Sequence, residues 1–210
     1  MNTHSISERW KTRTFSEKQC YAVFLFLLIP FIYCITITAN LNGIAFHGLL
    51  FSTGFISYTF IEYIAHRFWM HGKEEKHPGK SLERHVYHHT HPTELKITST
   101  MRNRLLMGSI FLIALSCWLD NYFTIFAGFY SGFVYYCYMH VLLHKPWARK
   151  IFPRLQASHI HHHCKYPNRC FSTCIIYWDQ LFNTSVPKET KISDRILEFY
   201  FGEDQHKNLH

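Results

Sequence analysis

The chain has 210 residues, of which 48% are hydrophobic and 18% aromatic, and its formal net charge is +8. This length suits a single domain over residues 1–210. Lysine and arginine are absent from the long apolar tracts, so we interpret the positive charge as membrane topology and attraction to anionic lipid, and we expect no nucleic-acid partner. The seven cysteines form no CxxC pair and several lie in apolar tracts, which excludes a disulfide framework.

Four apolar segments predict an all-α integral membrane protein. We assign the spans to residues 20–41, 44–65, 105–119 and 122–143. The first two have 22 residues each and share one charged residue, Glu62, whereas Asp120 separates the last two. Segments of ~20 apolar residues cross a bilayer, so the third, with 15 residues, needs its flanks or local thinning. We therefore expect four transmembrane helices in two hairpins.

The basic residues indicate the orientation of these spans. Four of the 22 precede the first span, eight lie between the second and third, and ten follow the fourth. With four spans these regions share one side of the membrane, which the positive-inside rule makes the cytosol. Both termini are then cytosolic, and residues 66–104 and 144–184 form a cap on that side. The membrane would be the endoplasmic reticulum in a eukaryote and the inner membrane in a bacterium.

Ten histidines at the cytosolic face have the spacings HxxxxH, HxxHH, HxxxH and HxxHH. In chain order they are His66, His71, His85, His88, His89, His140, His144, His159, His162 and His163. Residues at i, i+3 and i+4 project from one face of a helix. Imidazole suits zinc, copper, iron and nickel, and ten ligands are too many for one ion and about right for two. The pattern predicts a two-metal site.

The first group has two further features. His71 lies about 140° from His66 on an ideal helix, so we expect the helix to end nearby, with Gly72 as its C-cap. Glu62 lies one turn before His66. We expect its carboxylate to bond to a ligating imidazole and so to assist catalysis indirectly, with pairing to Arg67 as the alternative.

The other histidines do not share the spacing. His161 projects about 200° from His159, and we exclude it as a ligand. His91 adjoins Pro92, which ends the predicted helix over residues 82–91, and is a minor candidate for a ligand or orienting residue. We interpret five more as solvent-exposed or incidental: His4, His47, His77, His206 and His210.

Three smaller patterns concern packing and the membrane surface. Gly128 and Gly132 form a GxxxG pair, which predicts close helix packing. Residues 146–155 alternate apolar and basic side chains and predict a short helix in the headgroup interface. Residues 196–201 are apolar and aromatic, and we expect them to cover the site or to lie on the membrane.

The position of the histidines favours oxygen chemistry over three other functions. A haem cytochrome would place paired histidines in mid-bilayer, and a metal transporter would need polar ligands near the midplane. A zinc hydrolase commonly carries an HExxH carboxylate base, which this sequence lacks. A di-iron site can reduce dioxygen while the adjoining spans present a lipid with unreactive C–H bonds. A non-enzymatic membrane metal-binding or transport protein is the alternative from another class.

The four histidine groups together resemble the fatty acid hydroxylase / sterol desaturase superfamily of membrane di-iron oxygenases. Residues 178–184, Trp-Asp-Gln-Leu-Phe-Asn-Thr, are similar to the superfamily's W-D-x-L-F-G-T motif, with Asn183 in place of Gly. The resemblance covers residues 62–184. It implies four membrane helices under a cytosolic metal-bearing cap, two iron ions held by the ten histidines (or zinc in the isolated protein), dioxygen as oxidant and a separate electron carrier.

The resemblance identifies the substrate less specifically than it identifies the superfamily. The separate HxxxH group is similar to fatty acid 2-hydroxylases, which act on acyl chains of sphingolipids, whereas residues 66–72 and 139–147 also resemble beta-carotene hydroxylases. The implied function is a lipid monooxygenase acting on an acyl chain, with carotenoid ring hydroxylation or sterol desaturation as alternatives. Many members carry a fused cytochrome b5 domain. Because 19 residues precede the first span, we expect a separate donor similar to cytochrome b5 or ferredoxin.

Overall fold

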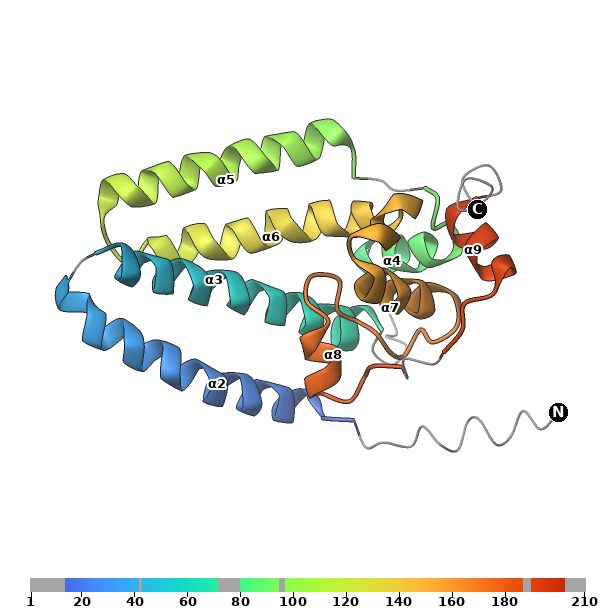
Figure 1. Cartoon of the computed structure of the whole chain (residues 1–210), viewed down its shortest axis with the longest axis horizontal. Helices are drawn as coiled ribbons and strands as arrows, with labels where there is room; N and C mark the ends of the chain where they lie inside the picture. Colours follow the sequence, from blue (N-terminus) through green and yellow to red (C-terminus); the bar gives the residue numbers. More distant parts are fainter. Residues whose placement is uncertain (1–13, 42, 72–79, 95–96, 187–189, 203–210) are drawn as a thin grey trace.

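A computed structural model describes residues 14–41, 43–71, 80–94, 97–186 and 190–202. Across these residues every regular element is a helix or a helical turn, which confirms the all-α fold class for this part of the chain. Four long helices lie side by side (Figure 1): α2 (Glu17–Thr38), α3 (Ile44–Ile64), α5 (Ser99–Leu119) and α6 (Thr124–Leu143). Contacts between neighbours give the order α5, α6, α3, α2 across the bundle.

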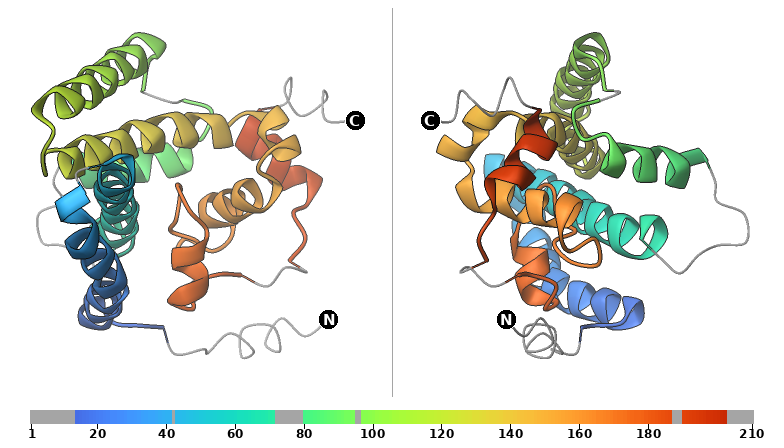
Figure 2. Two further views of the ribbon diagram at one scale, coloured as in Figure 1. Left: turned by 60° about the vertical axis from the view of Figure 1, so that its left-hand side comes forward. Right: turned by 90° about the vertical axis from the view of Figure 1, so that its right-hand side faces the viewer.

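Shorter elements form a cap at one end of this bundle. They are η2 (Ala65–Met70), α4 (Lys80–Thr90), η3 (Pro146–Lys150), α7 (Pro153–Cys164), α8 (Tyr177–Leu181) and α9 (Asp194–Phe201). The view onto the cap in Figure 2 (right) shows α7 between α4 and α9, and α7 contacts both helices. The turn η1 (Ala39–Leu41) between α2 and α3 lies at the opposite end of the bundle (Figure 1).

Within the described part of the chain, three helices are long and apolar enough to cross a membrane: Glu17–Thr38, Ile44–Met70 and Ser99–Leu119. The helix that contains the expected 15-residue third span has 21 residues and begins earlier, because Thr98 Oγ1 caps it by accepting the N–H of Met101 at 3.2 Å. Residues 99–104, expected in the cap, therefore belong to α5. The fourth expected span corresponds to α6. Its tyrosines and His140 lower its mean hydropathy, so α6 is not apolar enough to count with these three helices.

Three glycines allow α3 and α6 to pack closely. A Cβ placed on Gly54 would collide with the carbonyl oxygen of Ile125, and one placed on Gly128 with that of Phe51. Gly132 is likewise crowded by α3. The close packing predicted from the GxxxG pair is confirmed, because only residues without a side chain let these two backbones approach.

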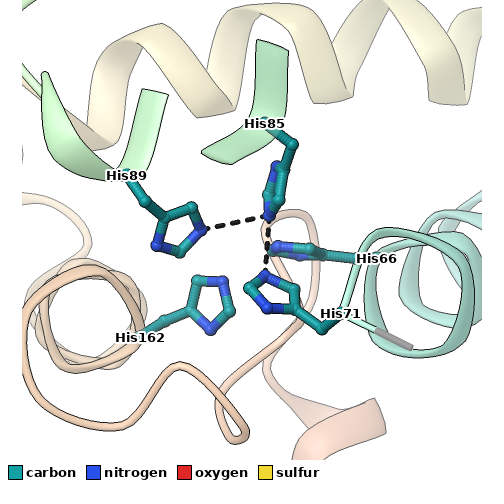
Figure 3. A group of neighbouring side chains, drawn as sticks. All are labelled: His66, His71, His85, His89 and His162. Atoms are coloured by element: carbon teal, nitrogen blue, oxygen red, sulfur yellow. Dashed lines mark hydrogen bonds between the residues drawn. The ribbon is translucent and has the colours of Figure 1, made fainter. Parts of the chain in front are cut away.

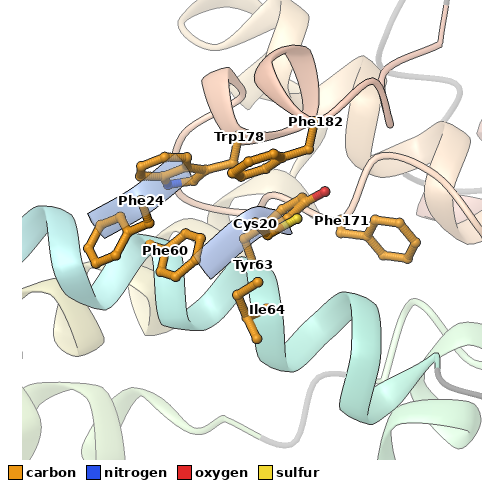
Figure 4. Close-up of a cluster of buried hydrophobic side chains, with 8 residues drawn as sticks. All are labelled: Cys20, Phe24, Phe60, Tyr63, Ile64, Phe171, Trp178 and Phe182. Atoms are coloured by element: carbon orange, nitrogen blue, oxygen red, sulfur yellow. The ribbon is translucent and has the colours of Figure 1, made fainter. Parts of the chain in front are cut away.

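An aromatic cluster fixes α8 to the bundle (Figure 4). Its buried members are Cys20, Phe24, Phe60, Tyr63, Ile64, Phe171, Trp178 and Phe182. Phe24 and Phe60 stack with ring centroids 4.0 Å apart, which joins α2 to α3. The indole N–H of Trp178 donates to Thr59 Oγ1 at 3.1 Å, so the polar edge of this large apolar side chain is also satisfied. The segment that precedes α8 is thereby held against the cap.

The segment over residues 146–155 is not the single interfacial helix that its pattern predicts. Pro146 opens η3 and Pro153 opens α7, since the fixed φ and missing N–H of proline suit the first turn of a helix. Two elements therefore share the segment. Trp147 and Ile151 are exposed at their junction, where they are accessible to a membrane surface.

Candidate metal centre

Ten histidines at the cap end of the bundle converge in two groups of five. The first group comprises His66, His71, His85, His89 and His162 (Figure 3). The second group comprises His88, His140, His144, His159 and His163. Within each group the facing ligand atoms all lie within 4.8 Å of one another. The structure brings together all ten histidines that the sequence spacing singles out.

Each HxxHH segment contributes to both groups. On α4, His85 and His89 belong to the first group and His88 to the second. The arrangement on α7 is the reverse, because its i and i+4 histidines join the second group and only His162 joins the first. Around a helix, i+4 lies ~40° to one side of i and i+3 lies ~60° to the other. One helix face can therefore supply two metal centres.

A π-helical turn over Ala65–Met70 brings His71 beside His66. In a π-helix the hydrogen bonds run from i to i+5, so residues five apart lie close together, whereas they diverge on an α-helix. The two ring centroids are 5.2 Å apart. The expected helix end is thus corrected to a widened turn, with His71 itself at the C-cap. Gly72, the predicted cap, lies outside the described residues.

The ring nitrogens in each group have the spacing of ligands around an ion. His85 Nε2 lies 2.7 Å from His71 Nε2 and 3.1 Å from His89 Nε2. In the second group the Nε2 atoms of His88 and His140 are 2.8 Å apart. Two nitrogens about 2.1 Å from one ion lie about 3 Å apart when they meet at a right angle. Both groups therefore fit a metal ion.

Backbone carbonyls fix the tautomer of two first-group histidines. The Nδ1–H of His66 donates to Phe171 O, and that of His162 donates to Arg169 O at 2.7 Å. Among the described residues, neither buried Nε2 atom has a hydrogen-bond partner. Buried polar atoms are normally satisfied, and a ligating imidazole commonly gives its other N–H to a carbonyl. An ion in the first group would satisfy both free nitrogens.

Burial keeps the imidazoles of the cap uncharged. It lowers the pKa of His71 and His88 to about 4 and the pKa of His89 to about 3. Burial, reinforced by neighbouring imidazoles, also lowers the pKa of His162 and His163 well below the usual range. At neutral pH these rings are therefore in the form that binds metal ions.

Comparison with known proteins decides the family. The sequence model of the fatty acid hydroxylase family matches residues 51–184, more than half of the chain. The chain belongs to the fatty acid hydroxylase family. The matched residues include all ten histidines and the motif over residues 178–184.

Named relatives in this family are of moderate similarity. A fatty acid 2-hydroxylase of Mus musculus is 29% identical over 149 residues, which are 67% of this chain and 40% of that protein. A dihydroceramide fatty acyl 2-hydroxylase of Arabidopsis thaliana is 27% identical over 160 residues, covering 72% of this chain and 67% of the relative. The ceramide very long chain fatty acid hydroxylase scs7 of Schizosaccharomyces pombe is 28% identical over 193 residues, covering 80% of this chain and 54% of that protein. The chain thus spans less than half of the mouse relative.

A solved structure of full-length scs7p, in which only the hydroxylase domain is visible, is also similar to this chain. The TM-score is 0.48 and the sequence identity 22%, and the likeness covers 86% of this chain and 70% of that one.

The tail motif of this member of the fatty acid hydroxylase family forms a tight turn around a buried carboxylate. Asp179 is fully buried and accepts the N–H groups of Phe171 and Ser172 at 2.9 and 2.8 Å. Asn183 has φ +58°, in the left-handed region that glycine adopts freely and asparagine tolerates. This explains why asparagine can replace the glycine of the motif. The sequence places Asp179 in the motif, but no local pattern reveals these long-range hydrogen bonds.

Glu62 has neither of its two expected partners. Its Oε1 atom accepts the N–H of Thr173 at 3.2 Å. His66 bonds to a backbone carbonyl, and Arg67 donates to a tyrosine hydroxyl at 2.8 Å. The physical reason is that the segment before α8 reaches over the end of α3 and presents its N–H groups there. Among the described residues, Glu62 is therefore linked to the site by its hydrogen bond to that segment.

Histidines outside the ten have other partners. His161 lies outside both groups, with Nε2 3.2 Å from Thr190 O, and His91 packs on a tyrosine of α4. His47 is not incidental, because its Nε2 lies 2.7 Å from Asp120 Oδ1 and so joins the two hairpin turns opposite the cap. The remaining ones lie outside the described residues: His4, His77, His206 and His210.

Helix α9 covers the second group, although it lies beyond the region that the family model matches. Tyr200 is fully buried, and its ring stacks on that of His144 with centroids 4.6 Å apart and planes 18° from parallel. Its hydroxyl donates to Leu143 O at 3.3 Å. Of the two locations expected for residues 196–201, the structure has the one over the site.

Proposed function

We propose that this protein is a membrane-bound non-haem di-iron oxygenase that hydroxylates a C–H bond of a fatty acyl chain. The observation that carries the proposal is the pair of five-histidine groups, with Nε2 atoms at ligand spacing, at one end of apolar helices. The first group would hold one ion and the second group the other. Iron is the proposed metal because imidazole suits it, and zinc is the alternative in isolated protein.

When bound, the iron ions would supply the reduction and activation of dioxygen. Hydroxylation converts R–H and O2, with two electrons and two protons, into R–OH and water. The chain's own residues keep the ligating rings neutral, orient two of them through backbone carbonyls and exclude water by burial. We propose that the two electrons come from a separate carrier similar to cytochrome b5 or ferredoxin.

The names of the relatives support an acyl substrate. The mouse and Arabidopsis proteins are named as 2-hydroxylases of fatty acids and dihydroceramide acyl chains, and none of the three reported relatives is named for a carotenoid or a sterol. We propose position 2 of an acyl chain for this protein too. Helices α2 and α5 expose large apolar side chains, including Phe26 and Phe111, and such surfaces suit contact with the lipid that would supply the substrate.

We propose four membrane spans within one domain, with α6 as the fourth. Helix α6 packs between α3 and α5, both of which are apolar enough to span, and a helix between two others needs less apolar surface than one that faces lipid. The cap and the start of α2 would then share one side of the membrane. The positive-inside rule makes this side cytosolic, at the endoplasmic reticulum of a eukaryote or the inner membrane of a bacterium.

The direct test is expression in cells that lack acyl-lipid hydroxylation, followed by mass spectrometry of total lipids. Wild-type protein should produce acyl chains hydroxylated at position 2. His162→Ala should abolish the product, because it removes a proposed ligand from the first group. His91→Ala is the matched control and should retain the product, since His91 lies outside both groups.

The alternatives give different results in the same experiment. Hydroxylated carotenoids or sterols would preserve the oxygenase and overturn the acyl substrate. A folded protein with two bound metal ions and no oxidised lipid would count against the oxygenase and favour metal binding or transport.

A further inference from the structure

The carboxylate of Asp179 accepts three hydrogen bonds, yet it touches none of the ten histidines. Oδ1 accepts the N–H of Phe171 at 2.9 Å and the hydroxyl of Thr184 at 2.7 Å, and Oδ2 accepts the N–H of Ser172 at 2.8 Å. We infer that Asp179 is a positioning residue for the first metal ion, acting through the backbone of residues 169–172. The inference rests on the proposed metal centre and concerns how it is held.

A single peptide group transmits the effect of Asp179 to His66. The peptide between Phe171 and Ser172 gives its N–H to Asp179 Oδ2 and its carbonyl to the Nδ1–H of His66. Because a trans peptide is planar, its N–H and C=O point in opposite directions, and fixing one fixes the other. The Asp179 carboxylate therefore fixes the orientation of the Phe171 carbonyl, which accepts the hydrogen bond from His66.

A second peptide group acts in the same way on His162. The peptide between Arg169 and Cys170 gives its carbonyl to the Nδ1–H of His162 at 2.7 Å and its N–H to Thr184 O at 2.9 Å. Thr184 is in turn bound to Asp179, because its hydroxyl donates to Oδ1 and its N–H donates to Asp179 O at 2.8 Å. Both carbonyls that orient first-group ligands thus depend on one buried carboxylate.

The shape of this segment needs such restraint. Cys170, between the two peptide groups, has φ +59°, a conformation that non-glycine residues rarely adopt. Backbone of this kind persists only when its surroundings determine it. The Asp179 carboxylate and the main chain of Thr184 supply those contacts on both sides of Cys170.

The effect should be confined to the first group. His66 and His162 both belong to it, and each has a buried Nε2 atom without a hydrogen-bond partner among the described residues. In the second group, by contrast, His144 packs against Tyr200 on α9, and the structure shows no hydrogen bond between His144 and the described segment over residues 169–172. A change at Asp179 should therefore weaken one metal ion and spare the other.

The test uses the full chain, purified in detergent and reconstituted with iron-57. Asp179→Asn keeps the size of the side chain but turns one acceptor into a donor that faces a backbone N–H. We expect iron affinity at one site to fall by about 10–100-fold, the usual effect of losing an outer-shell partner. Iron content should fall from two ions per chain towards one, and the Mössbauer signal of one iron should change while the other is retained.

Two further variants make the experiment decisive. Asp194→Asn, the same substitution at an exposed position of the cap, should retain two ions. Thr184→Val keeps the shape of the side chain and removes only the hydroxyl bond to Asp179, so it should change the Mössbauer signal of the same iron by a smaller amount. If Asp179→Asn does not fold, the result with Thr184→Val decides.

Two ions bound with wild-type affinity and spectrum in both site variants would overturn the inference, as would equal loss of both ions. Wild-type protein without a two-metal centre would instead refute the proposed function on which it rests.

Discussion

The rings of His89 and His163 stack with their centroids 4.3 Å apart and their planes 14° from parallel, although the two residues belong to different histidine groups. His89 comes from α4 and His163 from α7. The two groups are therefore adjacent, and one imidazole from each helix lies at the boundary between them. This arrangement makes the metal content of each group separately testable.

Substitution of His88 should affect the second metal ion and leave the first in place. His88 lies between its neighbours His85 and His89 in the sequence pattern, yet it faces His140 on α6. His88→Ala should weaken one ion by more than the about 10–100-fold that an outer-shell change costs. His85→Ala should weaken the other, and metal analysis with iron-57 spectra of both variants distinguishes them. Loss of the same iron signal from both would contradict the partition into two groups.

Gly128→Ala should destabilise the bundle. The new Cβ would collide with the carbonyl oxygen of Phe51, and the backbone of a packed helix cannot move aside locally. Overpacking of this kind costs about 1–3 kcal/mol, so the midpoint of thermal unfolding in detergent should fall. Gly48→Ala is the matched control, because a Cβ there meets nothing within 4 Å. It should raise stability by about 0.5–1 kcal/mol through better helix propensity. Equal midpoints for both variants would show that α3 and α6 do not pack as described.

Asn183→Ala should destabilise the turn that follows α8, and Asn183→Gly should not. The residue has φ +58°, where alanine costs about 1–2 kcal/mol and glycine pays no such penalty. Thermal unfolding of the two variants in detergent measures the difference. Since the turn holds Thr184 beside Asp179, the alanine variant should also bind the first metal ion less tightly. If alanine were as stable as glycine, a left-handed residue at this position would be ruled out.

Metal-free protein should lose stability in mild acid. The folded-state pKa values of His71, His88 and His89 are about 4, 4 and 3. The unfolded value is about 6.5, so below that pH the unfolded chain binds more protons than the folded one. Stability should therefore fall as the pH drops through about 6.5 towards 4, and the slope that these groups contribute should fade as the pH rises above 6.5. Thermal unfolding after chelation, scanned from pH 8 to pH 5, measures it; a flat profile below pH 6.5 would contradict the burial of neutral imidazoles.

The sequence predicts the helical class and the identity of the ten clustered histidines, because both depend on local periodicity. Apolar runs of about 20 residues define helices that can span a membrane, and i, i+3, i+4 spacing places imidazoles on one face. Hydropathy alone puts the start of the third span at residue 105, because it does not register the cap at Thr98, where the helix begins. Helix boundaries depend on such single hydrogen bonds.

The division of the histidines and the partners of Glu62 could not be read from the sequence. Whether His88 faces the first or second group depends on how α4 packs against α6 and α7, which no local pattern encodes. The π-helical turn before His71 likewise departs from the α-helical spacing on which the sequence pattern is based. Glu62 bonds to Thr173, a residue 111 positions away, and this requires the fold of the segment before α8. Long-range contacts of this kind decide the details of the site.

The central claim is that this chain uses dioxygen to hydroxylate an acyl lipid at a two-metal centre. The most direct measurement is mass spectrometry of lipids from cells that express the protein under isotopically heavy dioxygen in ordinary water. The account predicts acyl chains that carry one heavy oxygen atom in a new hydroxyl group, present with wild-type protein and His91→Ala and absent with His162→Ala. Hydroxyl groups with oxygen derived from water, or no oxidised lipid from a folded protein with two bound metal ions, would contradict it.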